Sequence, residues 1–137
     1  MTIPNSESFF KSIDCVQIPV TNLLEAIDFY GRHLGHSLIW KTNDAAGLRL
    51  SNSDSELVIH TKNRSVEIDW RVDSVDDAVH GWHEAGGTVL LEPFDIKIGR
   101  CAVICDPWGN ELVILDGSKG TLKTDDEGNV TGVEPPD

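Results

Sequence analysis

The feature that most constrains this chain is a similarity between two segments separated by 52 residues. When the chain is shifted by that amount, Tyr30 falls on Trp82 and Gly35 falls on Gly87. Almost no residues are identical, so the similarity lies in the order of apolar positions, helix cap and glycine. A repeat of this kind predicts two modules with the same architecture. A chance coincidence is the alternative that the repeat alone leaves open.

Each repeat has the pattern of a strand, a helix and three further strands. Residues 13–20 alternate apolar and polar side chains, as a half-buried strand does. Asn22 has the properties of a helix cap, and Gly35 those of a helix end. The expected strands are residues 13–20, 37–42, 47–50 and 56–61 in the first module and residues 66–72, 88–91, 96–105 and 111–115 in the second, with helices at 22–35 and 74–86.

The length of 137 residues suits one domain. We expect that domain over residues 1–117, with modules at about 12–61 and 66–116. Beyond Gly117 the composition becomes acidic and rich in turn-forming residues. Residues 121–124 and 130–133 are predicted to pair as a small hairpin, and a solvated acidic tail over residues 118–137 is the alternative.

Composition excludes several classes of partner. The net charge of -12 disfavours nucleic acids and anionic membranes, which would be repelled. No apolar run approaches the roughly 20 residues that a membrane span needs. The N-terminus lacks the basic start and apolar core of a secretory signal. Three cysteines are a sparse and odd set, so we expect a soluble cytoplasmic protein with reduced thiols.

Several of the expected strands have one polar face, because successive side chains of a strand point to opposite sides. A sheet covered by helices on one side only would gather these polar groups into a ligand-binding cleft. A solvated sheet face is the alternative. Trp108, in the tight turn 106–110, is expected to guard a cavity mouth or to cover a neighbouring subunit. The candidate ligand-binding residues are Cys15, Gln17, Glu56, His60, Glu67, Asp69, Arg71, Trp108, Glu111 and Val113.

Three features together resemble the vicinal oxygen chelate superfamily, which includes glyoxalase I, extradiol dioxygenases, and fosfomycin- and bleomycin-resistance proteins. They are the run CVQIPVTNLLEAIDFYGRHLG at residues 15–35, the doubled strand–helix module and the closing DPWGNELVIL at residues 106–115. The resemblance covers about residues 13–115. It implies an α+β fold in which two βαβββ modules form a curled mixed sheet around a cavity.

The resemblance also implies positions for a divalent metal. The four ligand positions of the metal-dependent members fall on Cys15, His60, Glu67 and Val113. His60 and Glu67 are the candidate metal ligands, whereas a valine side chain has no donor atom. A catalytic metal generally needs three protein ligands and an open position. The ligand set is therefore incomplete; no cofactor is favoured, and a divalent metal remains the alternative.

Two functions follow as expectations, and whether the protein is an enzyme stays open. The first is a non-catalytic small-molecule binder of the bleomycin-resistance type, implied to be a homodimer, whose acidic groove would suit a cationic ligand. In that groove Glu56, Glu67, Asp69 and Glu111 would provide negative charge, and Gln17 and Arg71 would provide hydrogen bonds. The second is a metal-dependent lyase, isomerase or dioxygenase that chelates vicinal substrate oxygens. A protein-interaction module with a vestigial cavity is a third interpretation.

Overall fold

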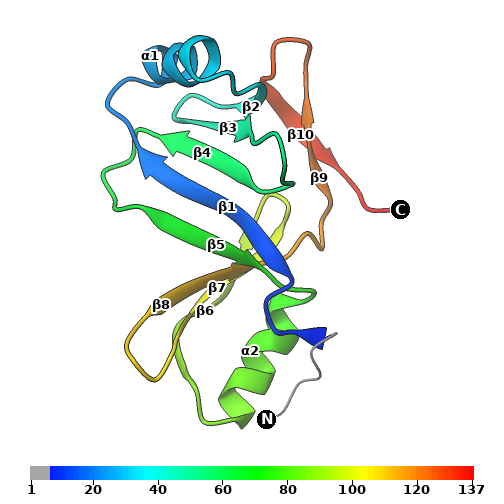
Figure 1. Ribbon diagram of the computed structural model, residues 1–137. Coiled ribbons are helices and arrows are strands. Elements are labelled where there is room, and N and C mark those ends of the chain that lie inside the picture. The colour runs from blue at the N-terminus through cyan, green and yellow to red at the C-terminus, as the bar shows by residue number, and fades with distance from the viewer. Residues whose placement is uncertain (1–6) are drawn as a thin grey trace. The chain divides into compact units, whose positions relative to one another are not determined.

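The computed structural model describes residues 7–137 and contains the predicted succession of elements twice (Figure 1). This α+β arrangement of two βαβββ modules confirms the predicted fold class. The first module consists of β1 (Ser12–Pro19), α1 (Leu23–Asp28), the π-helical turn η2 (Phe29–His33), β2 (Leu38–Lys41), β3 (Ala45–Arg49) and β4 (Glu56–His60). The second consists of β5 (Glu67–Arg71), α2 (Val75–Glu84), β6 (Thr88–Ile96), β7 (Gly99–Cys105) and β8 (Glu111–Leu115), and is followed by β9 (Thr121–Thr124) and β10 (Val130–Glu134).

The residues form two compact units. The N-terminal unit comprises residues 14–68 and 122–132. The C-terminal unit comprises residues 69–121, together with residues 7–13 and 133–137. Within the described part of the chain, no helix is long and apolar enough to span a membrane.

The N-terminal unit contains the strands β2, β3, β4 and β1, hydrogen-bonded in that order. β1 and β4 run parallel, with Cys15 beside Glu56 and Pro19 beside His60. The pairs β2–β3 and β3–β4 are antiparallel. This register decides which polar side chains of β1 and β4 become neighbours.

The first helix begins and ends where the sequence predicts. The Asn22 side chain accepts a 3.0 Å hydrogen bond from the backbone N–H of Glu25, and Gly35 closes the segment with a φ of 80°. After Asp28, however, the helix continues as the π-helical turn η2. The apolar stripe does not distinguish the two forms, because Ile27 of α1 and Tyr30 of η2 both pack against the same core.

The helical segment covers one face of this sheet and leaves the other face without a helix. Ala46, Leu48 and Ile59 are fully buried beneath the helix. Because side chains alternate along a strand, the neighbours of these residues, including Gly47 and His60, belong to the opposite face. We call this opposite face the helix-free face; its members on β1, β3 and β4 are Cys15, Gln17, Gly47, Glu56, Val58 and His60.

The C-terminal residues form a hairpin of β9 and β10 that lies against strand β2. The backbone N–H of Lys41 donates a 2.8 Å hydrogen bond to the carbonyl of Gly128, and Lys41 and Asn129 form a parallel bridge. A side chain at position 128 would crowd Leu38, 2.9 Å from its Cδ2. The hairpin thus covers part of an edge strand that would otherwise be open to pairing with another chain.

Two hairpin turns of the chain use the same five-residue design. In the turn 125–129, Asp125 Oδ1 accepts from the backbone N–H groups of Glu127 and Asn129, and Oδ2 accepts from the Asn129 side chain. Asp106 makes the equivalent bonds in the turn 106–110. The glycine at the fourth position has a φ of 86° or 90°, which an L side chain rarely adopts.

The C-terminal unit contains β5, β8, β7 and β6 in that hydrogen-bonded order. Its core consists of Val72, Val75, Val79, Ala102, Ile104 and Ile114. One strand prediction is wrong here. β6 continues to Ile96 and β7 begins at Gly99, whereas strands at 88–91 and 96–105 were expected. Pro93 is tolerated because β6 lies at the edge of the order and its pairing with β7 is interrupted by bulges.

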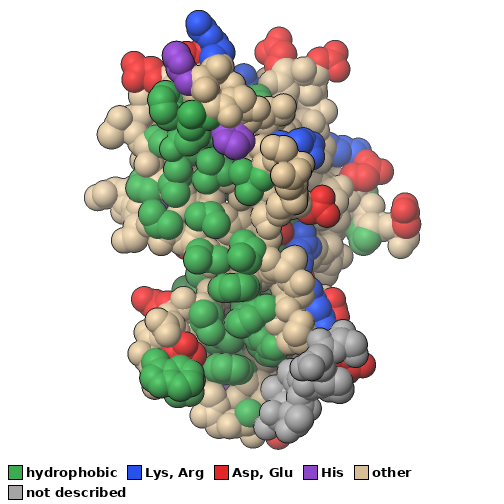
Figure 2. Space-filling model, viewed as in Figure 1, with side chains coloured by type: hydrophobic (Ala, Val, Ile, Leu, Met, Phe, Trp, Pro, Cys, Tyr) green, Lys and Arg blue, Asp and Glu red, His purple; other side chains and the backbone are tan. Residues whose placement is uncertain are grey.

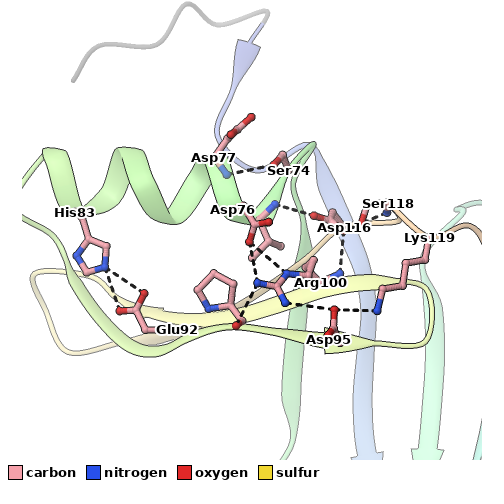
Figure 3. A network of polar contacts seen from close by, with 12 residues as sticks. Ser74, Asp76, Asp77, His83, Glu92, Asp95, Arg100, Asp116, Ser118 and Lys119 are labelled. Carbon is pink, nitrogen blue, oxygen red and sulfur yellow. Dashed lines mark hydrogen bonds and ion pairs between the residues drawn. The ribbon is translucent and has the colours of Figure 1, made fainter.

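A buried carboxylate joins helix α2 to strand β7 of the C-terminal unit (Figure 3). Asp116 is 2% exposed and accepts from the backbone N–H of Val75, at the first turn of α2, and from that of Arg100 in β7. Ser118 also donates to it. The Arg100 side chain in turn contacts Asp76 and Asp95. No pattern in the sequence predicts this network, since its members lie far apart along the chain.

Candidate functional site

The helix-free face of the N-terminal unit brings together four candidate residues: Cys15 and Gln17 on β1, and Glu56 and His60 on β4. Glu67, at the start of β5, joins them through a hydrogen bond in which Gln17 Nε2 donates to Glu67 Oε2 at 3.0 Å. Cys15 is 5% exposed and therefore occupies an interior position.

Arg64, which lies between the two expected modules and was not among the candidate residues, completes this arrangement. Its Nη2 donates a 2.6 Å hydrogen bond to Gln17 Oε1, and its Nη1 lies 3.9 Å from Glu67 Oε1. The Gln17 amide therefore bridges a guanidinium and a carboxylate. In the sequence, Arg64 stands three positions before the candidate residue Glu67. By itself this spacing indicates only a local ion pair and not a contact with Gln17.

His60 is fully buried, and its ring is held by the chain itself. The backbone N–H of Lys62 donates to Nδ1 at 3.2 Å, which assigns the hydrogen of the neutral ring to Nε2. Within residues 7–137, Nε2 has no hydrogen-bond partner. Burial, reinforced by the positive charge of Arg64, lowers the pKa of His60 below its usual value. The imidazole is thus neutral at pH 7 and offers a buried N–H.

The carboxylate of Glu56 accepts a hydrogen bond from a tryptophan that lies two strands away in the sheet. Trp40 Nε1 on β2 donates a 2.7 Å hydrogen bond to Glu56 Oε1 on β4. The indole crosses β3 at Gly47, where a Cβ would lie 2.1 Å from Trp40 Nε1. Glycine at this position therefore permits the contact.

The remaining candidates belong to the C-terminal unit. Asp69 is 4% exposed on β5 and lies beside Val113 of β8. The Arg71 side chain packs on Gly117, where a Cβ would lie 2.4 Å from Nη1. Glu111 and Trp108 are exposed, and the Trp108 side chain is 84% accessible.

Two surface hollows of the C-terminal unit, of about 310 and 330 Å³, contain none of the predicted residues. The first lies beside the start of α2, over Phe9 and Val72. The second lies between the end of α2 and the start of the turn 106–110.

The donor set does not fit the divalent metal that the resemblance implies. His60 Nε2 carries a hydrogen and so has no lone pair for a cation, whereas Glu67 is held by Gln17 and Arg64. Val113 has no donor atom. Across the described residues, no three His, Cys, Asp or Glu side chains are arranged to hold a metal ion.

The comparisons with known proteins agree with the architecture. The model of the Glyoxalase/Bleomycin resistance protein/Dioxygenase superfamily matches residues 12–114. No curated protein sequence matches the chain.

Solved structures give the same fold at low sequence identity. Methylmalonyl-CoA epimerase from Mycobacterium tuberculosis superposes with a TM-score of 0.69 at 18% identity, over 84% of this chain and 92% of that one. Streptomyces coelicolor methylmalonyl-CoA epimerase in complex with 2-nitronate-propionyl-CoA gives 0.63 at 19%, over 80% and 99%. A Legionella pneumophila structure described as NAD-dependent benzaldehyde dehydrogenase gives 0.58 at 21%, over 74% and 96%.

These identities establish the fold and not the activity, because one fold hosts many functions. The family match, in contrast, spans both modules. The chain therefore belongs to the glyoxalase/bleomycin resistance protein/dioxygenase superfamily, the group also called vicinal oxygen chelate.

Proposed function

We propose that this protein binds a small organic molecule on the helix-free face of its N-terminal unit, without the divalent metal of its enzymatic relatives. The observation that carries the proposal is the buried Nε2–H of His60, which has no hydrogen-bond partner among the described residues. Leaving such a group unpaired costs about 1–3 kcal/mol. Because His60 is fully buried, binding requires a local opening of this face, and a ligand that then accepts the hydrogen recovers that free energy.

The acidic composition predicts a cationic ligand, but the contacts of the carboxylates on this face argue against one. Glu67 already interacts with Gln17 and Arg64, and Glu56 accepts from Trp40. On the surface shown in Figure 2, acidic side chains are spread out and do not form one patch. Arg64 therefore already compensates the charge of Glu67, and Trp40 already occupies one oxygen of Glu56, so this site does not select a cation by charge alone.

The metal-dependent alternative loses its support for a different reason. A lyase, isomerase or dioxygenase of this superfamily would need the metal to polarise the vicinal oxygens of its substrate. The His60 tautomer, the engaged Glu67 carboxylate and the apolar Val113 leave too few donors for that ion. We therefore derive no reaction from this site.

A ligand screen with mapping tests the proposal. Untagged protein is first analysed for metal, before and after addition of Ni, Zn, Mn and Fe(II), and is then screened with small molecules by thermal shift. Hits are mapped by NMR chemical-shift changes. We expect shifts at Gln17, His60 and Arg64, and loss of binding in His60→Asn but not in the control His80→Asn, on exposed α2 surface. Near-stoichiometric metal that is lost in His60→Ala would contradict the proposal and favour the enzyme.

A homodimer and a cytoplasmic location belong to the same proposal. The dimer is proposed from the resemblance to bleomycin-resistance proteins, and the location from the three free cysteines. Sedimentation equilibrium over a range of protein concentrations measures the first. A monomer at all concentrations would refute it.

A further inference from the structure

We propose that the guanidinium of Arg64 receives the carboxylate of a small monoanionic ligand, on a face whose side chains do not fit a divalent metal. This inference rests on the proposed function, because it names the ligand class for the same face. We call Gln17, His60, Lys62, Arg64 and Glu67, all in the N-terminal unit, the polar cluster.

The guanidinium of Arg64 is held where it can bind a carboxylate. Arg64 is held by a 2.6 Å bond to Gln17 Oε1 and lies 3.9 Å from Glu67 Oε1. The bond to Gln17 uses one of its five N–H donors. The side chain is 42% exposed, so the remaining donors can reach a ligand. A guanidinium with two parallel N–H groups fits the two oxygens of a carboxylate.

The other side chains of the polar cluster also provide hydrogen-bond donors. His60 offers a buried N–H, because its Nδ1 already accepts from the backbone of Lys62. The Lys62 ammonium lies 4.0 Å from Asp44 Oδ2 and is 58% exposed. A metal ion requires lone pairs, whereas Arg64, His60 and Lys62 present hydrogens. These groups therefore favour a ligand rich in hydrogen-bond acceptors.

The charges around the polar cluster limit the charge of that ligand. The polar cluster contains two cationic side chains, Lys62 and Arg64, and one anionic one, Glu67, while Asp44 faces Lys62. The whole chain carries a net charge of -12. A ligand with several negative charges would be repelled by this field. A single carboxylate can be neutralised locally by Arg64, so a monocarboxylate fits better than a phosphate.

Titration of isotope-labelled protein with acetate and benzoate tests the inference, with inorganic phosphate as the comparison. We expect saturable NMR shifts of the Gln17 side-chain amide, the His60 ring and the Arg64 Nε–H. Arg64→Met should weaken carboxylate binding by about 10- to 100-fold, since it removes a charge-assisted pair. Arg64→Lys keeps the charge without the fork and should weaken it less. The control Arg32→Met removes an exposed guanidinium that pairs with Asp28 and should change nothing.

The outcomes separate this inference from the proposed function. Carboxylate binding that survives in Arg64→Met, no saturable binding of either carboxylate, or tighter binding of phosphate than of acetate would overturn the role of Arg64. In those cases a neutral compound such as benzamide is titrated next. If it still changes the NMR signals of Gln17 and His60, the proposed binding function is supported although the role of Arg64 is not. If no compound of any charge shifts these residues, the proposed function fails as well.

Discussion

The indole of Trp40 reaches across strand β3 to donate a 2.7 Å hydrogen bond to the carboxylate of Glu56. The two residues lie on β2 and β4, and Gly47 of β3 lies between them. This contact neutralises no charge, but it satisfies one oxygen of a part-buried carboxylate and holds a large aromatic side chain against the helix-free face.

Gly47→Ala should destabilise the protein. The new Cβ would lie 2.1 Å from Trp40 Nε1 and 2.7 Å from Glu56 Oε1, so the indole must move. Overpacking of this kind costs about 1–3 kcal/mol of unfolding free energy. Chemical denaturation measures the loss, and the double variant Trp40→Phe/Gly47→Ala should lose less than the sum of the single variants.

Gly81→Ala is the matched control for that experiment. Gly81 lies in α2, and a Cβ there meets no atom within 4 Å. Alanine should therefore raise the unfolding free energy, by about 0.5–1 kcal/mol, because it favours the helix. Equal effects of the two substitutions would contradict the steric argument at Gly47.

Asp116 should make stability depend on acid pH. Burial opposes its ionisation, but the hydrogen bonds from Val75, Ser118 and Arg100 prevail and lower its pKa below the usual 3.8. A carboxyl whose folded-state pKa is lowered stabilises the protein above the unfolded pKa, and that contribution disappears as the pH falls through the folded pKa. Denaturation of the wild type and Asp116→Asn at pH 7 and at decreasing pH should give a difference that shrinks with acid.

At pH 7 the Asp116→Asn variant should lose about 2–4 kcal/mol, since the amide places N–H groups where the carboxylate accepted them. Asp54→Asn, on the exposed loop between β3 and β4, is the control and should stay within about 0.5 kcal/mol. A pH-independent difference between the wild type and Asp116→Asn would refute the linkage.

His60 should contribute a second pH effect, of the same sign but at higher pH. Because its folded-state pKa is lowered below 6.5, the unfolded chain binds more protons in that range. Stability should therefore fall as the pH drops from 6.5 to the folded pKa of His60. An NMR titration of the His60 ring should give a midpoint below 6.5, and a midpoint above that value would exclude the neutral donor assigned to Nε2.

Asp125→Ala should loosen the C-terminal hairpin from β2. Asp125 accepts three hydrogen bonds within its turn, and these hold Gly128, whose carbonyl accepts from Lys41. We expect a loss of about 1–2 kcal/mol and faster hydrogen exchange at the Lys41 amide. Asp126→Ala changes the next residue of the same turn and is the control. Unchanged protection of Lys41 in Asp125→Ala would show that the turn does not hold the hairpin on the sheet.

The local structure of this protein follows from patterns within a few residues. Alternation predicts β1, the side chain of Asn22 begins α1, and Gly35 ends the helical segment with a positive φ. These features depend on contacts between residues at most a few positions apart, so the sequence alone determines them. The repeat and the two family motifs extend this to the whole fold, since the same local order occurs twice.

The site depends on contacts that no local pattern contains. Gln17 meets Glu67 at a separation of 50 residues and Arg64 at 47, and the pairing of distant strands decides those contacts. The extent of β6 likewise depends on its place at the edge of the strand order. Sequence determined the faces of the strands; only the tertiary register decided that Gln17 of β1 lies between Arg64 and Glu67, where an open set of metal ligands was the alternative.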